Sequence, residues 1–445
     1  MKLEKEKLIG KYNIAFGFFI ASIIAILIYN FISLDIFNLR HISNNVTKLY
    51  FADNISPAHQ KVIDLFNERN QGEIEVVPIN LPFTKFTTNE RKELLARSLR
   101  TDNSIIDVFS VDLIWISRFA KWAEPLDNYF AKEELERILP SLMANSYFNN
   151  TLVSIPMYLD IGVLFYRRDL MAEKVKNWDQ IENNFKHSLT WEQLIDISRT
   201  YFPGQYTFSF QGKAYEGLIC NYAEIVGSMG GQISFDDSTK INAKASIDAI
   251  EFMHDLIHKH KIAPLEVTDF SEVSSYRYMR YNDVPFLRGW FSSSVDTVSF
   301  DSDQQHFSTL DMAMLPAFGD KPFKTSQGGW NLMIKKNCTK KDEAVKFIKF
   351  ILSNEIQELM FNEARFLFVT NEMYDKKEVL GELTQYNLKE IIENHSVTRP
   401  VSENYTKISD IYSFYLNQAL RGKIGAEVAT DNIIRTIFSD QVFIK

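Results

Sequence analysis

A chain of 445 residues exceeds what one hydrophobic core usually supports, so we expect two or more structural units. The net charge is −8 and no long basic run occurs, which argues against a nucleic-acid partner. Two cysteines, Cys220 and Cys338, are too few for a disulfide scaffold. One bridge between them is possible, but nothing in the sequence brings them together, and we expect both to be free and buried.

Near the N-terminus, residues 14–33 form an apolar run without a charged side chain. About 20 such residues are enough to cross a bilayer as a helix. Lys2, Lys5, Lys7 and Lys11 lie in the preceding residues 1–13, which favours a cytoplasmic N-terminus and an extracytoplasmic location for the chain after residue 40. A cleaved signal peptide is the alternative, but the run lacks a small-residue cleavage pattern and no lipid-accepting cysteine follows. We therefore predict an uncleaved single-pass anchor followed by a spacer, residues 34–46.

Strand and helix signals alternate in the first part of the remaining chain. Ser56 and Pro57 open a helix, with serine as the N-cap and proline at the first helical position. Strands are expected at 48–52, 73–81 and 105–111, and a further helix at 89–99. This alternation predicts a parallel sheet covered by helices.

The alternation starts again after residue 156, with a strand expected at 161–165. Helices are expected at 191–201, with Thr190 as its cap, and at 243–260, 341–353, 355–363 and 408–420. No Gly/Ser linker occurs, so we expect short crossing strands to join the structural units.

Several blocks then follow one another in order between residues 47 and 440. They are Asp107-Val108-Phe109 with Val111-Asp112 and Trp115, Glu124-Pro125-Leu126-Asp127, residues 155–162, residues 165–170, residues 190–194, residues 210–220 with Gly230-Gly231, Gly328-Gly329-Trp330, and Arg399-Pro400. In this order they resemble the extracellular solute-binding proteins of the maltose-binding class, most closely the trehalose/maltose-binding branch of ABC sugar importers.

The resemblance implies an α/β fold of two lobes, the class II periplasmic-binding-protein-like fold, which closes on a sugar in the cleft. Each lobe is discontinuous: residues 47–158 and 314–367 are expected in lobe 1, and residues 159–313 and 368–445 in lobe 2. The implied partners are ABC permease subunits in the membrane. A monomer without cofactor, metal or enzymatic activity is expected.

Sugar recognition needs groups that bond hydroxyls and flat rings that cover the C–H faces of a saccharide. Asp112 follows a buried strand, where open α/β sheets place ligands, and a turn cap is its alternative role. Tyr158 and Asp160 lie two apart, so they share one side of an extended strand, with hinge packing as the alternative. Both resemble positions that contact sugar in the family.

Three further candidates come from the resemblance. Trp290 resembles the family's stacking tryptophan, and Trp330 resembles a second stacking position. Trp330 follows two glycines, Gly328 and Gly329, whose lack of side chains would let the backbone approach a ligand, so Gly328 is a ligand-binding candidate as well. Arg399 resembles a hydroxyl donor. Packing is the alternative role for both tryptophans, and an ion pair between the lobes is the alternative for Arg399.

The chain departs from the family pattern at two places. Phe291 and Ser292 follow Trp290, where the family usually has Pro-Tyr. The loop 53–56 is short and lacks an expected glutamate, for which Asp53 can partly substitute. These departures fit a different disaccharide, a modified sugar or a loss of binding.

Two other signals carry less weight. His254 and His258 share a helix face with Glu251, but no further ligand lies nearby, so we expect a solvated face rather than a metal site. Glu216 has no nucleophile or acid at a defined spacing, so packing is favoured over a general-base role.

The sequence therefore predicts a membrane-anchored receptor that delivers a di- or oligosaccharide to an ABC importer. One alternative is a sensor or adaptor for a membrane signalling partner, motivated by the uncleaved helix and the missing lipid cysteine. The other is an anchored glycoside hydrolase, for which Asp112 and Asp160 would be the carboxylate pair.

Overall fold

The computed structural model describes residues 46–82, 85–86, 88–101, 104–234, 241–292, 310–399 and 402–438. The anchor predicted at residues 14–33 lies outside these ranges. Among the helices within them, none has the length and apolar character needed to span a membrane.

The chain divides into two compact units, residues 1–48 with 67–75, and residues 49–66 with 76–445. In the described part of the smaller unit, the Thr47 amide donates to the Glu73 carbonyl at 2.9 Å, and Lys48 pairs with Glu75 at 3.7 Å. The larger unit contains the candidate site.

The strands of the described chain form one sheet of nine and a separate hairpin. They are β1 (Thr47–Asp53), β2 (Ile74–Asn80), β3 (Val108–Asp112), β4 (Tyr147–Phe148), β5 (Thr151–Leu152), β6 (Ile155–Arg167), β7 (Phe208–Ser209), β8 (Phe286–Trp290), β9 (Leu310–Ala313), β10 (Thr325–Ile334) and β11 (Ser396–Val397). The large sheet has the order β2-β1-β3-β10-β6-β8-β7, with β11 beside β10 and β9 beside β6.

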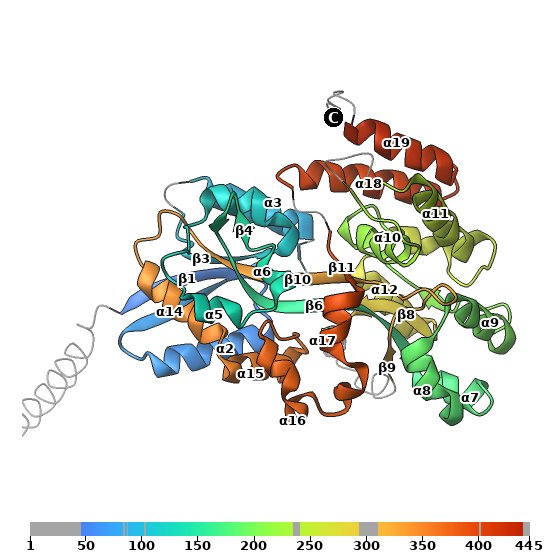
Figure 1. Ribbon diagram of the computed structural model, residues 1–445, viewed down its shortest axis with the longest axis horizontal. Coiled ribbons are helices and arrows are strands. Elements are labelled where there is room, and N and C mark those ends of the chain that lie inside the picture. The colour runs from blue at the N-terminus through green and yellow to red at the C-terminus, as the bar shows by residue number, and fades with distance from the viewer. Residues whose placement is uncertain are drawn as a thin grey trace, which may run out of the picture. The chain divides into compact units, whose positions relative to one another are not determined.

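Strands β6 and β10 are the longest and lie side by side at the centre of the sheet (Figure 1). The first half of β6 pairs with β10, and its second half pairs with β8 and β9. Strand β6 is 13 residues long and strand β10 is 10 residues long. The prediction of a parallel sheet is wrong in part. The β1–β3 pair is parallel, but β10 runs antiparallel to both β3 and β6. Each of these strands returns from a distant part of the chain, which local alternation does not reveal.

The helices follow the predicted segments closely. They are α2 (Pro57–Arg69), α3 (Thr88–Leu99), α4 (Ile116–Phe119), α5 (Lys132–Glu136), α6 (Pro140–Met143), α7 (Arg168–Lys174), α8 (Trp178–Ser188), α9 (Trp191–Tyr201), α10 (Glu216–Ser228), α11 (Ala243–His258), α12 (Glu272–Tyr281), α14 (Lys341–Ile351), α15 (Asn354–Ala364), α16 (Lys377–Leu380), α17 (Leu388–Glu390), α18 (Tyr405–Leu420) and α19 (Ala426–Phe438).

Both predicted N-caps are present. The Ser56 hydroxyl accepts from the His59 amide at 3.3 Å, and the Thr190 hydroxyl accepts from the Gln193 amide at 3.2 Å. The Thr190 amide in turn donates to the side-chain oxygen of Gln193 at 2.9 Å, which completes a capping box. These local bonds satisfy backbone donors that a helix leaves unpaired in its first turn.

Apolar side chains of the sheet and of the helices on it form a continuous core. It includes Phe109 of β3, Leu164 of β6 and Leu218 of α10. The two cysteines, Cys220 and Cys338, are free and buried, as predicted. Helix α18 packs against α10, α11 and α19, and these four helices lie together in Figure 1.

Candidate ligand-binding site

Strands β6 and β10 bring most of the predicted residues to the centre of the sheet. Tyr158 and Asp160 of β6 lie opposite Trp330 and Gly328 of β10. Asp112, at the end of β3, lies opposite Trp330 on the other side of β10. Because side chains alternate along a strand, Tyr158 and Asp160 share one face of β6, and Gly328 and Trp330 share one face of β10. Residues that are up to 218 positions apart are thus neighbours.

Trp290 lies close to this group because two glycines of β10 leave space. Gly328 leaves space for the Trp290 ring, and Gly329 lets the backbone of β6 approach β10. Trp290 lies opposite Gly162 of β6, and a Cβ atom on Gly328 would lie only 2.9 Å from its ring. Gly329 has φ +143°, and a Cβ atom there would lie 2.7 Å from the Tyr158 carbonyl oxygen. From the sequence, these glycines are expected to let the backbone approach a ligand. In the structure the indole of Trp290 occupies the space at Gly328, and strand β6 occupies the space at Gly329.

Each of the two site tryptophans has a guanidinium group over its ring. The guanidinium carbon of Arg91 lies 4.4 Å from the ring centroid of Trp330, and that of Arg288 lies 4.2 Å from Trp290. Such cation–π contacts orient the rings. Both tryptophans remain partly exposed.

The ring of Tyr158 packs against another aromatic ring instead of a guanidinium group. It stacks on Phe366 with centroids 3.9 Å apart and an interplanar angle of 11°. His59 lies beside both rings, with centroid distances of 5.9 Å to Tyr158 and 5.3 Å to Phe366. Tyr158 is 8% exposed, so the packing alternative for this residue is visible in the structure together with its place at the site.

Arg399 is buried and forms an ion pair on each side. Its Nη1 donates to Glu216 Oε1 at 2.7 Å, and its Nη2 donates to Asp112 Oδ1 at 3.4 Å and to the Gln327 carbonyl oxygen at 3.4 Å. Asp112 also accepts from the Ile114 amide at 3.3 Å, which is the predicted turn cap. Burial raises the pKa of Asp112, and the neighbouring Arg399 opposes that rise. Asp112 therefore combines capping with the ion pair suggested for Arg399.

Glu216 begins helix α10 and joins three side chains. Its carboxylate accepts from Arg399, from the Tyr405 hydroxyl and from the Ser409 hydroxyl at 2.7 Å. Tyr405 and Ser409 both belong to α18, so Glu216 links α10, α18 and Arg399. The packing interpretation of Glu216 is confirmed by these contacts.

Asp160 is engaged by the turn that departs from the family pattern. Its Oδ1 accepts from the Ile161 amide at 2.9 Å and the Ser292 amide at 3.1 Å, and its Oδ2 accepts from the Ser292 hydroxyl at 2.5 Å. A buried carboxylate needs such donors. Ser292 therefore has a defined task here, which is to hold Asp160, and Asp160 in turn fixes the position of the turn after Trp290.

Burial raises the pKa of Asp160 to about 6, although the bonds from Ser292 and Ile161 oppose the rise. The folded protein thus binds a proton that the unfolded chain releases near pH 4. Asp160 stabilises the fold below pH 4, and this contribution is lost as the pH rises to 6. Relative to Asp160→Asn, we expect the wild type to lose up to about 3 kcal/mol of unfolding free energy between pH 4 and 6. Urea unfolding of both proteins at intervals of half a pH unit measures this. Parallel curves would contradict it.

Arg91 belongs to the candidate site through its contact with Trp330, although it was not predicted from the sequence. Its Nη2 donates to Asp53 Oδ1 at 3.0 Å, and the Nε2 of His59 lies 3.7 Å from Asp53 Oδ2. Asp53 is 2% exposed, so this residue orients Arg91 rather than facing solvent. A signal for Arg91 exists in the sequence, because it shares the apolar side of α3 with Leu95 and Leu99. A charged residue on the buried side of a helix needs a partner or a ligand.

A second buried ion pair, between Arg288 and Glu224, lies against strands β6 and β10. Arg288 donates through Nη2 to Glu224 Oε1 at 2.5 Å and through Nε to Glu224 Oε2 at 3.1 Å. Glu224 also accepts from the Ser326 amide of β10 at 3.0 Å. A Cβ atom on Gly162 would lie 2.2 Å from Glu224 Oε1, so only glycine lets the pair lie against β6.

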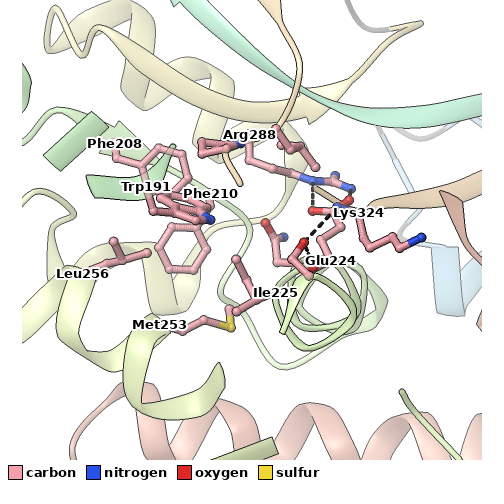
Figure 2. Close-up of a pocket in the computed structure, with 13 residues that line it drawn as sticks. Trp191, Phe208, Phe210, Glu224, Ile225, Met253, Leu256, Arg288 and Lys324 are labelled. Atoms are coloured by element: carbon pink, nitrogen blue, oxygen red, sulfur yellow. Dashed lines mark hydrogen bonds and ion pairs between the residues drawn. The ribbon is translucent and has the colours of Figure 1, made fainter. Parts of the chain in front are cut away.

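This pair also lines a pocket, which Figure 2 shows. Aromatic side chains lie on one side of the pocket and the ion pair lies on the other. The lining residues are Trp191, Phe208, Phe210, Asn221, Glu224, Ile225, Ser228, Met253, Leu256, Arg288, Leu315, Pro316 and Lys324. The residues predicted to bind sugar are not among them, but Arg288 both lines the pocket and lies over the ring of Trp290, so the pocket adjoins the candidate site.

The histidines of α11 differ from the solvated face that was expected. The rings of His254 and His258 stack with centroids 4.1 Å apart, and His258 Nε2 bonds the Leu420 carbonyl oxygen at 2.8 Å. The pair therefore packs against the end of α18. Within the described ranges, no cluster of three or more metal-ligating side chains occurs.

Two long strands, β6 and β10, pair in a mixed sheet, and aromatic rings and charged groups lie close together where they pair. A family model described as bacterial extracellular solute-binding protein matches residues 52–358. The chain belongs to this family, and the resemblance to extracellular solute-binding proteins found in the sequence is confirmed.

Individual relatives agree with this assignment. A probable ABC transporter-binding protein of Deinococcus radiodurans is 25% identical over 353 residues, which cover 76% of this chain and 80% of the relative. Maltose-bound MalE3 of T. maritima matches with a TM-score of 0.76 and 25% identity, over 88% of this chain and 99% of its own. A solute-binding protein from Thermotoga lettingae TMO, bound with α-D-tagatose, has a TM-score of 0.75 at 20% identity, over 88% and 98% of the two chains. These structures confirm the two-lobed fold.

Proposed function

We propose that this protein is the sugar-binding component of an ABC importer, held on the extracytoplasmic side of the membrane by residues 14–33. The observation that carries the proposal is the meeting of three aromatic rings, Tyr158, Trp290 and Trp330, with an ion pair between the partly buried Asp112 and the buried Arg399. Rings cover the apolar faces of a saccharide, and fixed ions bond its hydroxyls. The maltose bound by the T. maritima relative supports a di- or oligosaccharide as the ligand.

The same geometry supports the proposed division into lobes. Residues 47–158 with 314–367 form lobe 1, and residues 159–313 with 368–445 form lobe 2. Strand β6 passes from one to the other, and Arg399 of lobe 2 reaches Asp112 of lobe 1. A sugar that contacts both lobes favours the closed form, which then docks on the permease subunits.

Binding is favoured over hydrolysis by the environment of the two carboxylates. A glycosidase needs one carboxyl group to donate a proton and the other to act as base or nucleophile. Asp112 is paired with Arg399, and Asp160 accepts three bonds from protein donors. Both carboxylates are thus held as fixed acceptors.

A thermal-shift screen of the full chain tests the proposed function, with trehalose, maltose, sucrose, glucose and mannitol in the panel. A ligand at about 100 times its dissociation constant adds about 2.7 kcal/mol to the unfolding free energy. We expect a clear rise in Tm with at least one saccharide, and its loss in Trp290→Ala. The absence of a shift with every sugar, in a protein that unfolds cooperatively, would overturn the proposal.

A further inference from the structure

A contact outside the candidate sugar site joins the two proposed lobes. The hydroxyl of Thr406, in the first turn of α18, accepts from Lys92 Nζ at 3.3 Å and from Arg118 Nη1 at 3.2 Å. Lys92 belongs to α3 and Arg118 to α4, both in lobe 1, whereas α18 belongs to lobe 2. The three side chains are called the clasp below.

The position of Lys92 is unusual for a lysine. Its side chain is 2% exposed, and its ammonium group lies 5.5 Å from the ring centroid of Trp115. Burial lowers the pKa of Lys92, Arg118 lowers it further, and the carboxylates of Glu93 and Asp410 oppose the change. A buried ammonium is retained where its hydrogen bonds are satisfied. Here Thr406 provides one acceptor, and this acceptor comes from the other lobe.

One carboxylate of lobe 1, that of Glu93, lies beside both cations of the clasp. Glu93 lies 3.5 Å from Lys92 and 2.9 Å from Arg118. Separation of the lobes therefore leaves both cations beside Glu93, but it breaks the bonds to Thr406 and moves Asp410 of α18 away from Lys92. Hydrogen bonds to charged groups are stronger than those between neutral groups, so two of them on one hydroxyl favour the joined arrangement measurably.

We propose that the clasp holds the two lobes closed without a ligand, so that the free receptor already populates its closed form. None of its three side chains belongs to the residues assigned to sugar binding. The clasp and the sugar therefore stabilise the same closed form independently, and the clasp lowers the apparent dissociation constant by raising the population that is competent to hold the ligand.

Distance measurements between spin labels on the sugar-free protein test this inference. Labels at Lys132→Cys in α5 and Lys244→Cys in α11 report on the two lobes, because both lysine side chains are 82% exposed. The native cysteines are buried and are not expected to react. We expect a dominant short distance in the wild type, and in Thr406→Val a ratio of closed to open form about tenfold lower. Thr406→Ser keeps the hydroxyl and should resemble the wild type.

Lys92→Met provides a second variant, since it removes the donor and keeps the length of the side chain. The proposal is overturned if the wild type shows only the long distance, or if Thr406→Val and Lys92→Met both retain the wild-type distribution. Because the inference rests on the proposed two-lobed function but this measurement uses no sugar, its failure is distinct from a negative sugar screen. If a sugar has been found, Thr406→Val should also dissociate it up to about tenfold faster.

Discussion

Replacing Arg288 by methionine is expected to lower the free energy of unfolding by about 3–5 kcal/mol. Arg288 is 1% exposed and Glu224 is 4% exposed, so the substitution leaves a buried carboxylate without its cation. The same carboxylate accepts from the Ser326 amide of β10, so the substitution also disturbs a hydrogen bond to a central strand of the sheet. Urea unfolding followed by circular dichroism measures the change.

Two controls show whether the buried charge causes this loss. The double variant Glu224→Gln/Arg288→Met removes both charges and should recover part of the stability. Lys244→Met breaks an exposed pair with Asp248 on one face of α11, and it should leave the stability unchanged. If Arg288→Met were as stable as the wild type, the ion pair would have no structural role.

Replacing Trp330 by alanine is expected to weaken binding of the sugar found in the screen by about 30-fold, which corresponds to about 2 kcal/mol. The ring of Trp330 lies under Arg91, and its side chain is partly exposed, so a sugar at the candidate site can contact the exposed part of the ring. Trp330→Phe retains a flat ring and should lose less. Isothermal titration calorimetry measures these affinities.

Trp122→Ala is the matched control for this experiment. Trp122 is also partly exposed and also carries a cation over its ring, with Lys121 Nζ at 4.4 Å from the centroid. It lies outside the candidate site, so its replacement should leave the affinity unchanged. An equal loss in both variants would mean that a general change of the fold, rather than stacking on the sugar, causes the effect.

Local signals predicted the helices well and the sheet less well. The cap residues Ser56 and Thr190 stand at the starts of α2 and α9, because a helix start depends on bonds within a few residues. Strand β10 was not predicted, and the length of β6 was underestimated. Their pairing joins residues 155–161 to residues 327–332, and no local pattern records such a distant partner.

The candidate site shows the same division. The residue types of Asp112, Tyr158, Trp290 and Trp330 and the family order identified them from the sequence, and the structure places them together. Arg91 was missed, since nothing near it in the sequence names Asp53 or Trp330 as its neighbours. Ser292 was counted as a departure from the family, yet it supplies two of the bonds to Asp160.

The sequence by itself therefore determined the family, the positions of seven of the described helices and the identity of the polar and aromatic candidates, because these depend on local pattern and residue chemistry. The tertiary structure alone decided the antiparallel position of β10, the two partners of Arg399 and the contact of Lys92 with Thr406. In each case the physical reason is that a long-range contact satisfies a buried polar group, and the energy of that contact depends on three-dimensional proximity rather than on sequence spacing.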